Sequence, residues 1–158
     1  MWHKIKIYII SILIALGTGL LSSALTQMNM DIYPELVKPP LAPPPILFPI
    51  VWTVLYVLMG ISSSMIYLRK NENIVASQNA LSLYGANLII NFTWSIIFFG
   101  FQKYLFAFIW LLFLLFTIVR MVTSFERLNK IAAYLQLPYI IWVIFAGYLN
   151  FAIYILNR

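Results

Sequence analysis

The chain has no cysteine, a single histidine and very little charge. Of its 158 residues, 9% are charged, 63% are hydrophobic and 17% are aromatic. Soluble domains carry about 25% charged residues, so this chain has too few to cover a water-facing surface. A water-soluble globule, a disordered chain and a disulfide-bonded scaffold are therefore excluded. Thiolate metal sites and thiol catalysis are excluded too, and His3 alone cannot form a histidine metal cluster.

The charged residues that are present divide the sequence into long apolar windows. With one exception, these windows reach the roughly 20 residues that a helix needs to cross a bilayer. The exception, 104–119, is extended by Arg120, whose aliphatic stem can lie in the apolar zone. The sequence therefore predicts an all-α membrane protein with a single domain over residues 1–158. Its bundle of five transmembrane helices is expected near 6–27, 46–68, 79–101, 104–124 and 131–156.

The first span has features of a cleavable signal peptide, because Lys4 and Lys6 precede its apolar run. The run is longer than is usual for such a peptide, and we expect the span to be retained. Its small residues, Ala15, Gly19 and Ser23, recur every four positions, which predicts close helix packing.

The positive charges indicate an orientation. The N-terminus, 69–78 and 120–130 together hold seven of the ten Lys and Arg residues. The positive-inside rule then places the N-terminus inside and the C-terminus outside. The net charge of +6 is mainly a topology signal, so no nucleic acid partner is expected. The short N-terminus shows no mitochondrial transit signal, and a bacterial cell membrane is the expected location.

Seven of the eight prolines lie between positions 34 and 49, in the connection between the first two spans. Proline favours an extended backbone of low conformational entropy. This segment is either a stiff connector or a preformed lid over one end of the bundle. The remaining connections are short, which indicates antiparallel packing of sequential spans.

Three spans carry polar, small and aromatic residues at helical spacing, so that each presents one mixed stripe. The stripes are Trp52, Tyr56, Met59, Gly60 and Ser63; Asn87, Asn91, Trp94, Ser95 and Phe98; and Trp142, Ala146, Leu149, Asn150 and Ile153. Such surfaces either pack helices together or line a cavity for a large, flat, mostly apolar ligand. The residues leave both interpretations open.

Several kinds of chemistry have no residues to support them. No predicted span carries a carboxylate or a histidine, which argues against a proton relay or ion-coupled transport. The sequence has no phosphate-binding P-loop, no nucleophile elbow and no HExxH zinc motif. Conventional acid–base or metal catalysis is therefore not expected.

Four motifs in order resemble those of the TspO/MBR family, the tryptophan-rich sensory and translocator proteins that include the peripheral benzodiazepine receptor. The motifs are Leu36-x-Lys38-Pro39 with Pro43-Pro44; Trp52-x-x-Leu55-Tyr56; Asn87-x-x-x-Asn91-x-x-Trp94-Ser95-x-x-Phe98-Phe99; and Pro138-Tyr139-x-x-Trp142-x-x-x-Ala146-x-x-Leu149-Asn150. The resemblance covers nearly the whole chain.

The resemblance implies a five-helix bundle, commonly a homodimer in the membrane lipid, with a pocket beneath the first loop. That pocket binds porphyrins such as protoporphyrin IX and isoquinoline or benzodiazepine-type drugs, without a covalently bound cofactor. By motif position, the ligand-binding residues are Ser23, Tyr33, Pro43, Trp52, Asn91, Trp94, Trp142, Ala146 and Leu149. Some bacterial members degrade protoporphyrin IX in light, which would make Trp52 and Trp142 the catalytic residues here.

The chain departs from the family pattern in its first loop. Ile32 and Leu41 stand where members usually have tryptophan, and Pro49-Ile50 replaces a Gly-Pro pair. The loop therefore has two fewer aromatic rings for ligand contact. The leading hypothesis is a ligand-binding protein with a sensory or regulatory role. The alternatives are a light-dependent porphyrin-degrading enzyme and a passive transporter of porphyrin or lipid.

Overall fold

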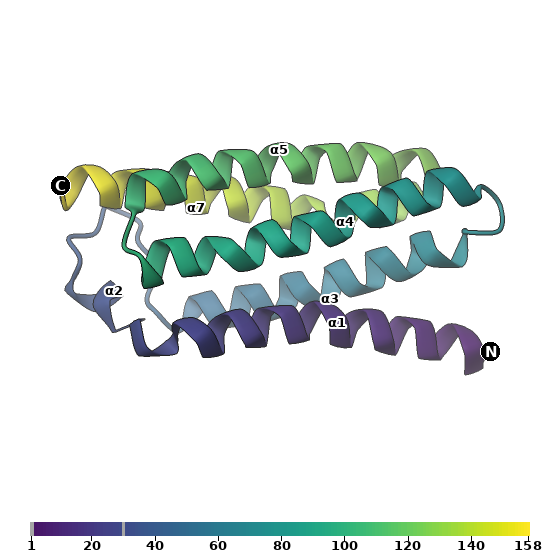
Figure 1. Cartoon of the computed structure of the whole chain (residues 1–158), viewed down its shortest axis with the longest axis horizontal. Coiled ribbons are helices and arrows are strands. Elements are labelled where there is room, and N and C mark those ends of the chain that lie inside the picture. Colours follow the sequence, from purple (N-terminus) through teal and green to yellow (C-terminus); the bar gives the residue numbers. More distant parts are fainter. Residues whose placement is uncertain (1, 30) are drawn as a thin grey trace.

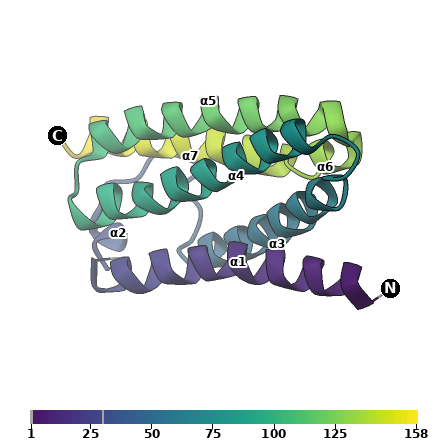
Figure 2. The same ribbon diagram turned by 45° about the vertical axis from the view of Figure 1, so that its right-hand side comes forward.

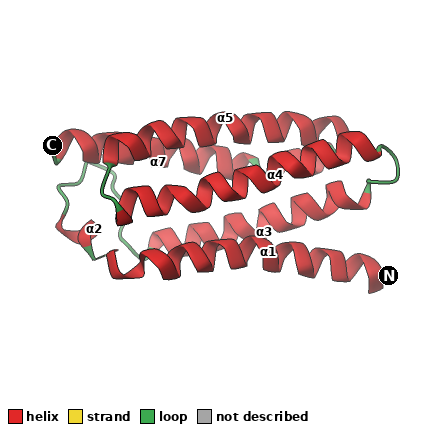
Figure 3. Cartoon of the chain, viewed as in Figure 1, coloured by secondary structure: helices red, strands yellow, loops and turns green. Residues whose placement is uncertain are grey.

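The computed structural model describes residues 2–29 and 31–158, and within them every regular element is a helix (Figure 3). Five helical segments are long and apolar enough to cross a membrane, which confirms the predicted all-α membrane bundle. The elements are α1 (Trp2–Thr26), a 3₁₀ turn (Gln27–Asn29), α2 (Ile32–Glu35), α3 (Leu47–Leu68), α4 (Ile74–Ser95), a π-helical turn (Ile96–Gly100), α5 (Tyr104–Leu128), α6 (Lys130–Tyr134) and α7 (Leu137–Leu156).

The long helices form a ring of neighbours around one interior. α1 packs against α3 and α4, α4 against α5, α5 against α6 and α7, and α3 against α6. The N-terminal end of α1 lies at one end of the bundle (Figures 1 and 2). The C-terminus, α2 and the first loop lie together at the other end.

The observed helix ends differ from the predicted spans for local reasons. α4 begins at Ile74 because Asn73 caps it, its side-chain oxygen accepting from the Ala76 N–H at 3.0 Å. The last span is interrupted between Tyr134 and Leu137, where Pro138 occupies the first turn of α7. A proline is tolerated there because the N–H that it lacks would have no intrahelical partner.

Two glycines set the spacing between α1 and α3. A Cβ atom at Gly60 would overlap the backbone of Ile12, so the two helices are in backbone contact at this point. Nearer the first loop, the Tyr56 ring lies over Gly19, where a Cβ atom would also overlap it. The space between the helices therefore grows from backbone contact at Gly60 to the width of an aromatic ring at Gly19.

Candidate ligand-binding cavity

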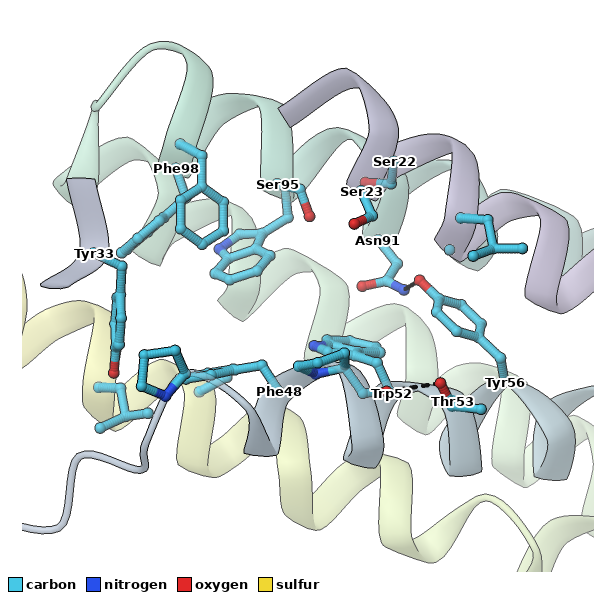
Figure 4. A pocket seen from close by; sticks show the side chains of 18 of the residues that line it. Ser22, Ser23, Tyr33, Phe48, Trp52, Thr53, Tyr56, Asn91, Ser95 and Phe98 are labelled. Carbon is cyan, nitrogen blue, oxygen red and sulfur yellow. Dashed lines mark hydrogen bonds between the residues drawn. The ribbon is translucent and has the colours of Figure 1, made fainter. Parts of the chain in front are cut away.

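A cavity of about 360 Å³ lies inside the ring, at the end of the bundle nearest the first loop (Figure 4). Its walls come from the adjoining halves of α1, α3, α4 and α7, and from the first loop. The lining residues are Leu16, Gly19, Leu20, Ser22, Ser23, Tyr33, Pro45, Phe48, Pro49, Trp52, Thr53, Tyr56, Asn91, Trp94, Ser95, Phe98, Phe99, Ala146, Leu149, Asn150 and Ile153.

The three predicted stripes meet in this part of the bundle, and each has residues that line the cavity and at least one that does not. From α4, Asn91, Trp94, Ser95 and Phe98 line the cavity. Asn87 lies deeper, where it accepts from the Tyr139 hydroxyl at 3.0 Å and donates to Thr117 at 3.1 Å. Both interpretations of the stripes therefore hold, each for a different length of the same helices.

Hydrogen bonds between helices fix the polar side chains of the cavity. The Asn91 side-chain N–H donates to the Tyr56 hydroxyl at 2.9 Å, which joins α4 to α3. The Trp94 indole N–H donates to the Asn150 side-chain oxygen at 3.2 Å, and Asn150 donates in turn to the Tyr104 carbonyl at 2.8 Å. These polar groups are buried and paired, as the low-dielectric interior of a membrane bundle requires.

Aromatic faces form much of the remaining wall. The Trp52 ring stacks on Tyr56 with ring centroids 5.5 Å apart, and the Trp94 ring lies 5.3 Å from Phe98. The π-helical turn that follows Ser95 carries Phe98 and Phe99 into the cavity. Short π-helical segments inside helices often occur at functional sites.

The cavity holds no charged side chain among the described residues that line it. The hydroxyls of Ser23 and Ser95 and the side-chain oxygen of Asn91 are turned toward it (Figure 4). The chemistry of the walls is thus aromatic and aliphatic, with a few uncharged hydrogen-bonding groups. Such walls suit a flat apolar ligand with a few polar atoms.

The first loop closes the end of the cavity, which it lines with Tyr33 and Pro45. The Tyr33 ring packs edge-on against Phe48 with centroids 5.3 Å apart, while the Lys38 ammonium lies 5.2 Å from the Tyr33 ring centroid. The Tyr33 hydroxyl is buried and has no hydrogen-bond partner among the described residues. Burial raises the pKa of this phenol above its ordinary value, because it disfavours the phenolate.

The C-terminal half of α7 and the residue after it fasten the same loop. Asn157 accepts from the Val37 N–H at 2.9 Å and donates to the Val37 carbonyl at 2.9 Å. The Tyr148 hydroxyl donates to the Pro40 carbonyl, also at 2.9 Å. We call the segment 31–46 the lid, and these three hydrogen bonds the latch. The geometry favours the lid interpretation of the proline-rich segment over that of a simple connector.

Seven of the nine residues predicted for the site line the cavity: Ser23, Tyr33, Trp52, Asn91, Trp94, Ala146 and Leu149. The other two, Trp142 and Pro43, are not among its lining residues. Trp142 lies behind Phe48, with ring centroids 5.9 Å apart, and packs on Phe145 at 5.6 Å. Pro43 is buried within the lid. Phe48 thus lines the cavity, whereas Trp142, whose ring it contacts, does not.

Sequence reasoning missed the apolar lining residues Leu16, Leu20, Phe48 and Phe99. An apolar side chain that faces a cavity has the same chemistry as one that faces lipid, so composition carries no signal for it. The helical spacing does contain some information, since Leu16, Leu20 and Ser23 share one face of α1.

The family's sequence pattern matches residues 10–156, which include all three stripes and the lid. The chain belongs to the TspO/MBR family. This confirms the predicted resemblance, and it identifies the chain as an integral membrane protein together with its five apolar helices.

Relatives in the TspO/MBR family come from distant branches of life. The chain is 37% identical to the tryptophan-rich protein TspO of Chlorobaculum tepidum over 148 residues, which cover 91% of each chain. It is 34% identical to the tryptophan-rich protein TspO of Archaeoglobus fulgidus, over 93% of this chain and 94% of the relative. The translocator protein of Bos taurus is 32% identical, over 75% of this chain and 70% of the relative.

Proposed function

We propose that this TspO/MBR protein binds flat, mostly apolar ligands in the cavity and has a sensory or regulatory role. Tetrapyrroles such as protoporphyrin IX are the natural class, and isoquinoline or benzodiazepine-type drugs would occupy the same space. The observation that carries the proposal is a cavity walled by stacked aromatic rings, with uncharged hydrogen-bonding groups and no formal charge on its lining residues.

The dimensions and chemistry of the cavity support this ligand class. Its volume of about 360 Å³ lies within the roughly 300–1,000 Å³ typical of small-molecule sites. Trp52 and Trp94 offer flat apolar faces, while Ser23, Ser95 and Asn91 offer hydrogen bonds to the polar atoms of a ligand. A relative in Cereibacter sphaeroides, 30% identical over 148 residues, is named tryptophan-rich sensory protein, which supports the regulatory role.

Titration of the purified protein with protoporphyrin IX, followed by tryptophan fluorescence, tests the proposal. Ala146→Leu fills part of the cavity wall and is expected to weaken binding about tenfold or more, which corresponds to about 1.4 kcal/mol. Ala152→Leu is the matched control, because Ala152 lies on the same helix but not among the lining residues. Equal affinities of the two variants, or no saturable quenching of the wild type, would refute binding at this site.

A second candidate function is light- and oxygen-dependent degradation of a bound porphyrin. The position of Trp52 favours it, because this indole lines the cavity and stacks on Tyr56. Trp142, the other expected catalytic residue, lies behind Phe48. Under illumination, Trp52→Phe should therefore slow porphyrin bleaching more than Trp142→Phe. Equal bleaching by the wild type and both variants would reduce the reaction to photosensitisation by the porphyrin itself.

We further propose that the protein is a homodimer with its N-terminus inside and its C-terminus outside. The clustering of basic residues supports this orientation. Cysteine labelling at Lys4→Cys and Arg158→Cys in sealed vesicles tests it, because an impermeant reagent should reach only position 158 from the outer side. Mass measurement of the protein in lipid nanodiscs tests the dimer.

A further inference from the structure

The latch bears on how a ligand reaches the cavity. Asn157 uses both atoms of its side-chain amide on one lid residue, Val37, and Tyr148 holds Pro40. Both latch residues belong to the α7 end of the chain, and α7 also supplies Ala146, Leu149 and Asn150 to the cavity wall. Uptake through the lid would require all three hydrogen bonds to break. The latch therefore holds the lid in its closed position.

The side wall of the cavity between α1 and α3, near the lid, is thin. Five of the residues that line the cavity are also exposed: Pro45 in the lid, Leu20 and Ser23 on α1, and Pro49 and Thr53 on α3. Leu20 is 71% exposed. We call the four helix residues the rim. Where a side chain both lines the cavity and is exposed at the surface of the bundle, the cavity wall is only one residue thick.

The packing of the two helices explains why the wall is thin there. α1 and α3 are in backbone contact at Gly60 and Ile12, and the Tyr56 ring fills the space between them at Gly19. Along both helices, the rim residues lie on the lid side of the Gly19–Tyr56 contact, and there they line the cavity. Tyr56 thus forms the inner limit of the gap.

We propose that ligands enter the cavity sideways from the lipid bilayer, through the gap between α1 and α3 at the rim, while the lid stays latched to α7. This inference rests on the proposed ligand-binding function and adds a route to it. The rim lies within the last two turns of α1 and the first two turns of α3, so it faces the bilayer leaflet at the lid end. In lipid, an apolar molecule needs no passage through water to reach it.

The rim chemistry defines the class of ligand that can pass. Leu20 and Pro49 are apolar, and Ser23 and Thr53 add only two hydroxyls, of which Thr53 already donates to the Pro49 carbonyl at 2.7 Å. A charged group would lose its hydration in the gap without gaining a partner. The route therefore suits a flat amphiphile that is dissolved in the leaflet, with its charged groups remaining at the interface while its apolar rings slide between the helices.

A bulky label at the rim tests the route in the full chain reconstituted in lipid vesicles. The chain has no native cysteine, so Thr53→Cys gives a single site for a bulky maleimide. Thr18→Cys is the matched control: Thr18 also lies on a helix surface and donates to the carbonyl four residues earlier, but it does not line the cavity. Tryptophan fluorescence reports binding of protoporphyrin IX added to the vesicles and its release on dilution into porphyrin-free vesicles.

The label at position 53 is expected to slow binding and release together, each by about tenfold or more, because a blocked passage hinders both directions. The label at position 18 should change neither rate. In a separate arm, the double variant Asn157→Leu/Tyr148→Phe should speed hydrogen exchange at the Val37 amide, which shows that the latch is open. Its porphyrin binding and release rates should nevertheless stay within twofold of the wild type.

Two results would overturn the proposal. One is a position-53 label that leaves both rates unchanged, and the other is a latch variant that binds and releases porphyrin about tenfold faster. The first would exclude the gap between α1 and α3 as the route, and the second would place the route through the lid. If unlabelled wild-type protein shows no saturable quenching at all, the proposed function itself fails, and the sideways route fails with it.

Discussion

Trp94 on α4 and Asn150 on α7 are joined across the interior by a hydrogen bond of 3.2 Å from the indole N–H to the amide oxygen. The Asn150 side-chain N–H in turn donates to the backbone carbonyl of Tyr104 on α5. One buried amide, only 1% exposed, thus connects three helices of the cavity wall. The same amide therefore orients a side chain of the cavity wall and stabilises the bundle.

Replacement of Asn150 by leucine should destabilise the bundle, because the buried Trp94 N–H loses its partner and the Tyr104 carbonyl loses its side-chain donor from α7. Unpaired buried groups of this kind cost about 1–3 kcal/mol each, with the smaller value more typical within membranes. Denaturant unfolding in detergent micelles measures the change. Combining Asn150→Leu with Trp94→Phe should cost less than the sum of the two single variants, and simple additivity would mean that the hydrogen bond contributes nothing.

Gly60→Ala should destabilise the contact between α1 and α3, because its methyl group would overlap the Ile12 backbone. Overpacking of this kind costs about 1–3 kcal/mol. Gly147→Ala is the control, since nothing lies within 4 Å of a Cβ atom there, and alanine favours a helix over glycine by about 1 kcal/mol. The two substitutions should therefore shift the unfolding midpoint in opposite directions, and a shared direction would contradict the close approach at Gly60.

Alkaline pH should weaken the closed lid through Tyr33. Burial raises the pKa of its phenol, so the folded chain keeps this proton at a pH where the unfolded chain has begun to release it. The unfolded phenol titrates near pH 10. The contribution of Tyr33 to stability should thus be constant below about pH 10 and fall as the pH rises through the raised folded pKa.

Thermal unfolding of the wild type and of Tyr33→Phe between pH 8 and pH 11 isolates this effect. Lys38, which lies over the Tyr33 ring, is present in both proteins, so the difference between them reports the phenol. The wild type should lose stability relative to Tyr33→Phe only in the upper part of the range. A constant difference across all pH values would show that the phenol does not titrate differently on folding.

Leu41→Gly should stabilise the lid. Leu41 has φ of 71° at the third position of a turn closed by the Ala42 N–H and the Pro39 carbonyl at 3.2 Å. The left-handed conformation costs a residue with a side chain about 1–2 kcal/mol, and glycine avoids this cost. Slower hydrogen exchange at Ala42 is the expected readout. Ile46→Gly, at the N-cap of α3 with φ of −64°, has no such strain to relieve and serves as the control, which should not slow exchange at Ala42.

The helices and their inward faces can be predicted from the sequence, because the scarcity of charge and the helical spacing of polar residues are each visible along a whole span. Asn91, Trp94 and Ala146 could be placed in the site from their spacing and from family motifs, and all three line the cavity. Local features were harder to predict. The cap at Asn73 and the π-helical turn after Ser95 depend on single backbone geometries, which a pattern averaged over a helix does not contain.

Trp142 shows a second limit of prediction from motifs. Its position in the motif indicates the right helix and the right face, yet Phe48 lines the cavity and Trp142, whose ring it contacts, does not. Phe48 belongs to the first turn of α3 and is far from Trp142 in the sequence. Which of two aromatic residues on neighbouring helices reaches the cavity is decided by their packing against each other, and neither helix alone carries that information.

The position of the latch near the end of α7 affects where a tag can be attached to this protein. Asn157 holds the lid from just beyond the end of α7, so any tag or fusion partner attached after Arg158 begins one residue away from the lid's main anchor. Such an extension would act directly on the latch and so on the closed position of the lid. An extension before α1 begins at the opposite end of the bundle and should leave the latch unaffected, which makes that end the better one for attaching reporters.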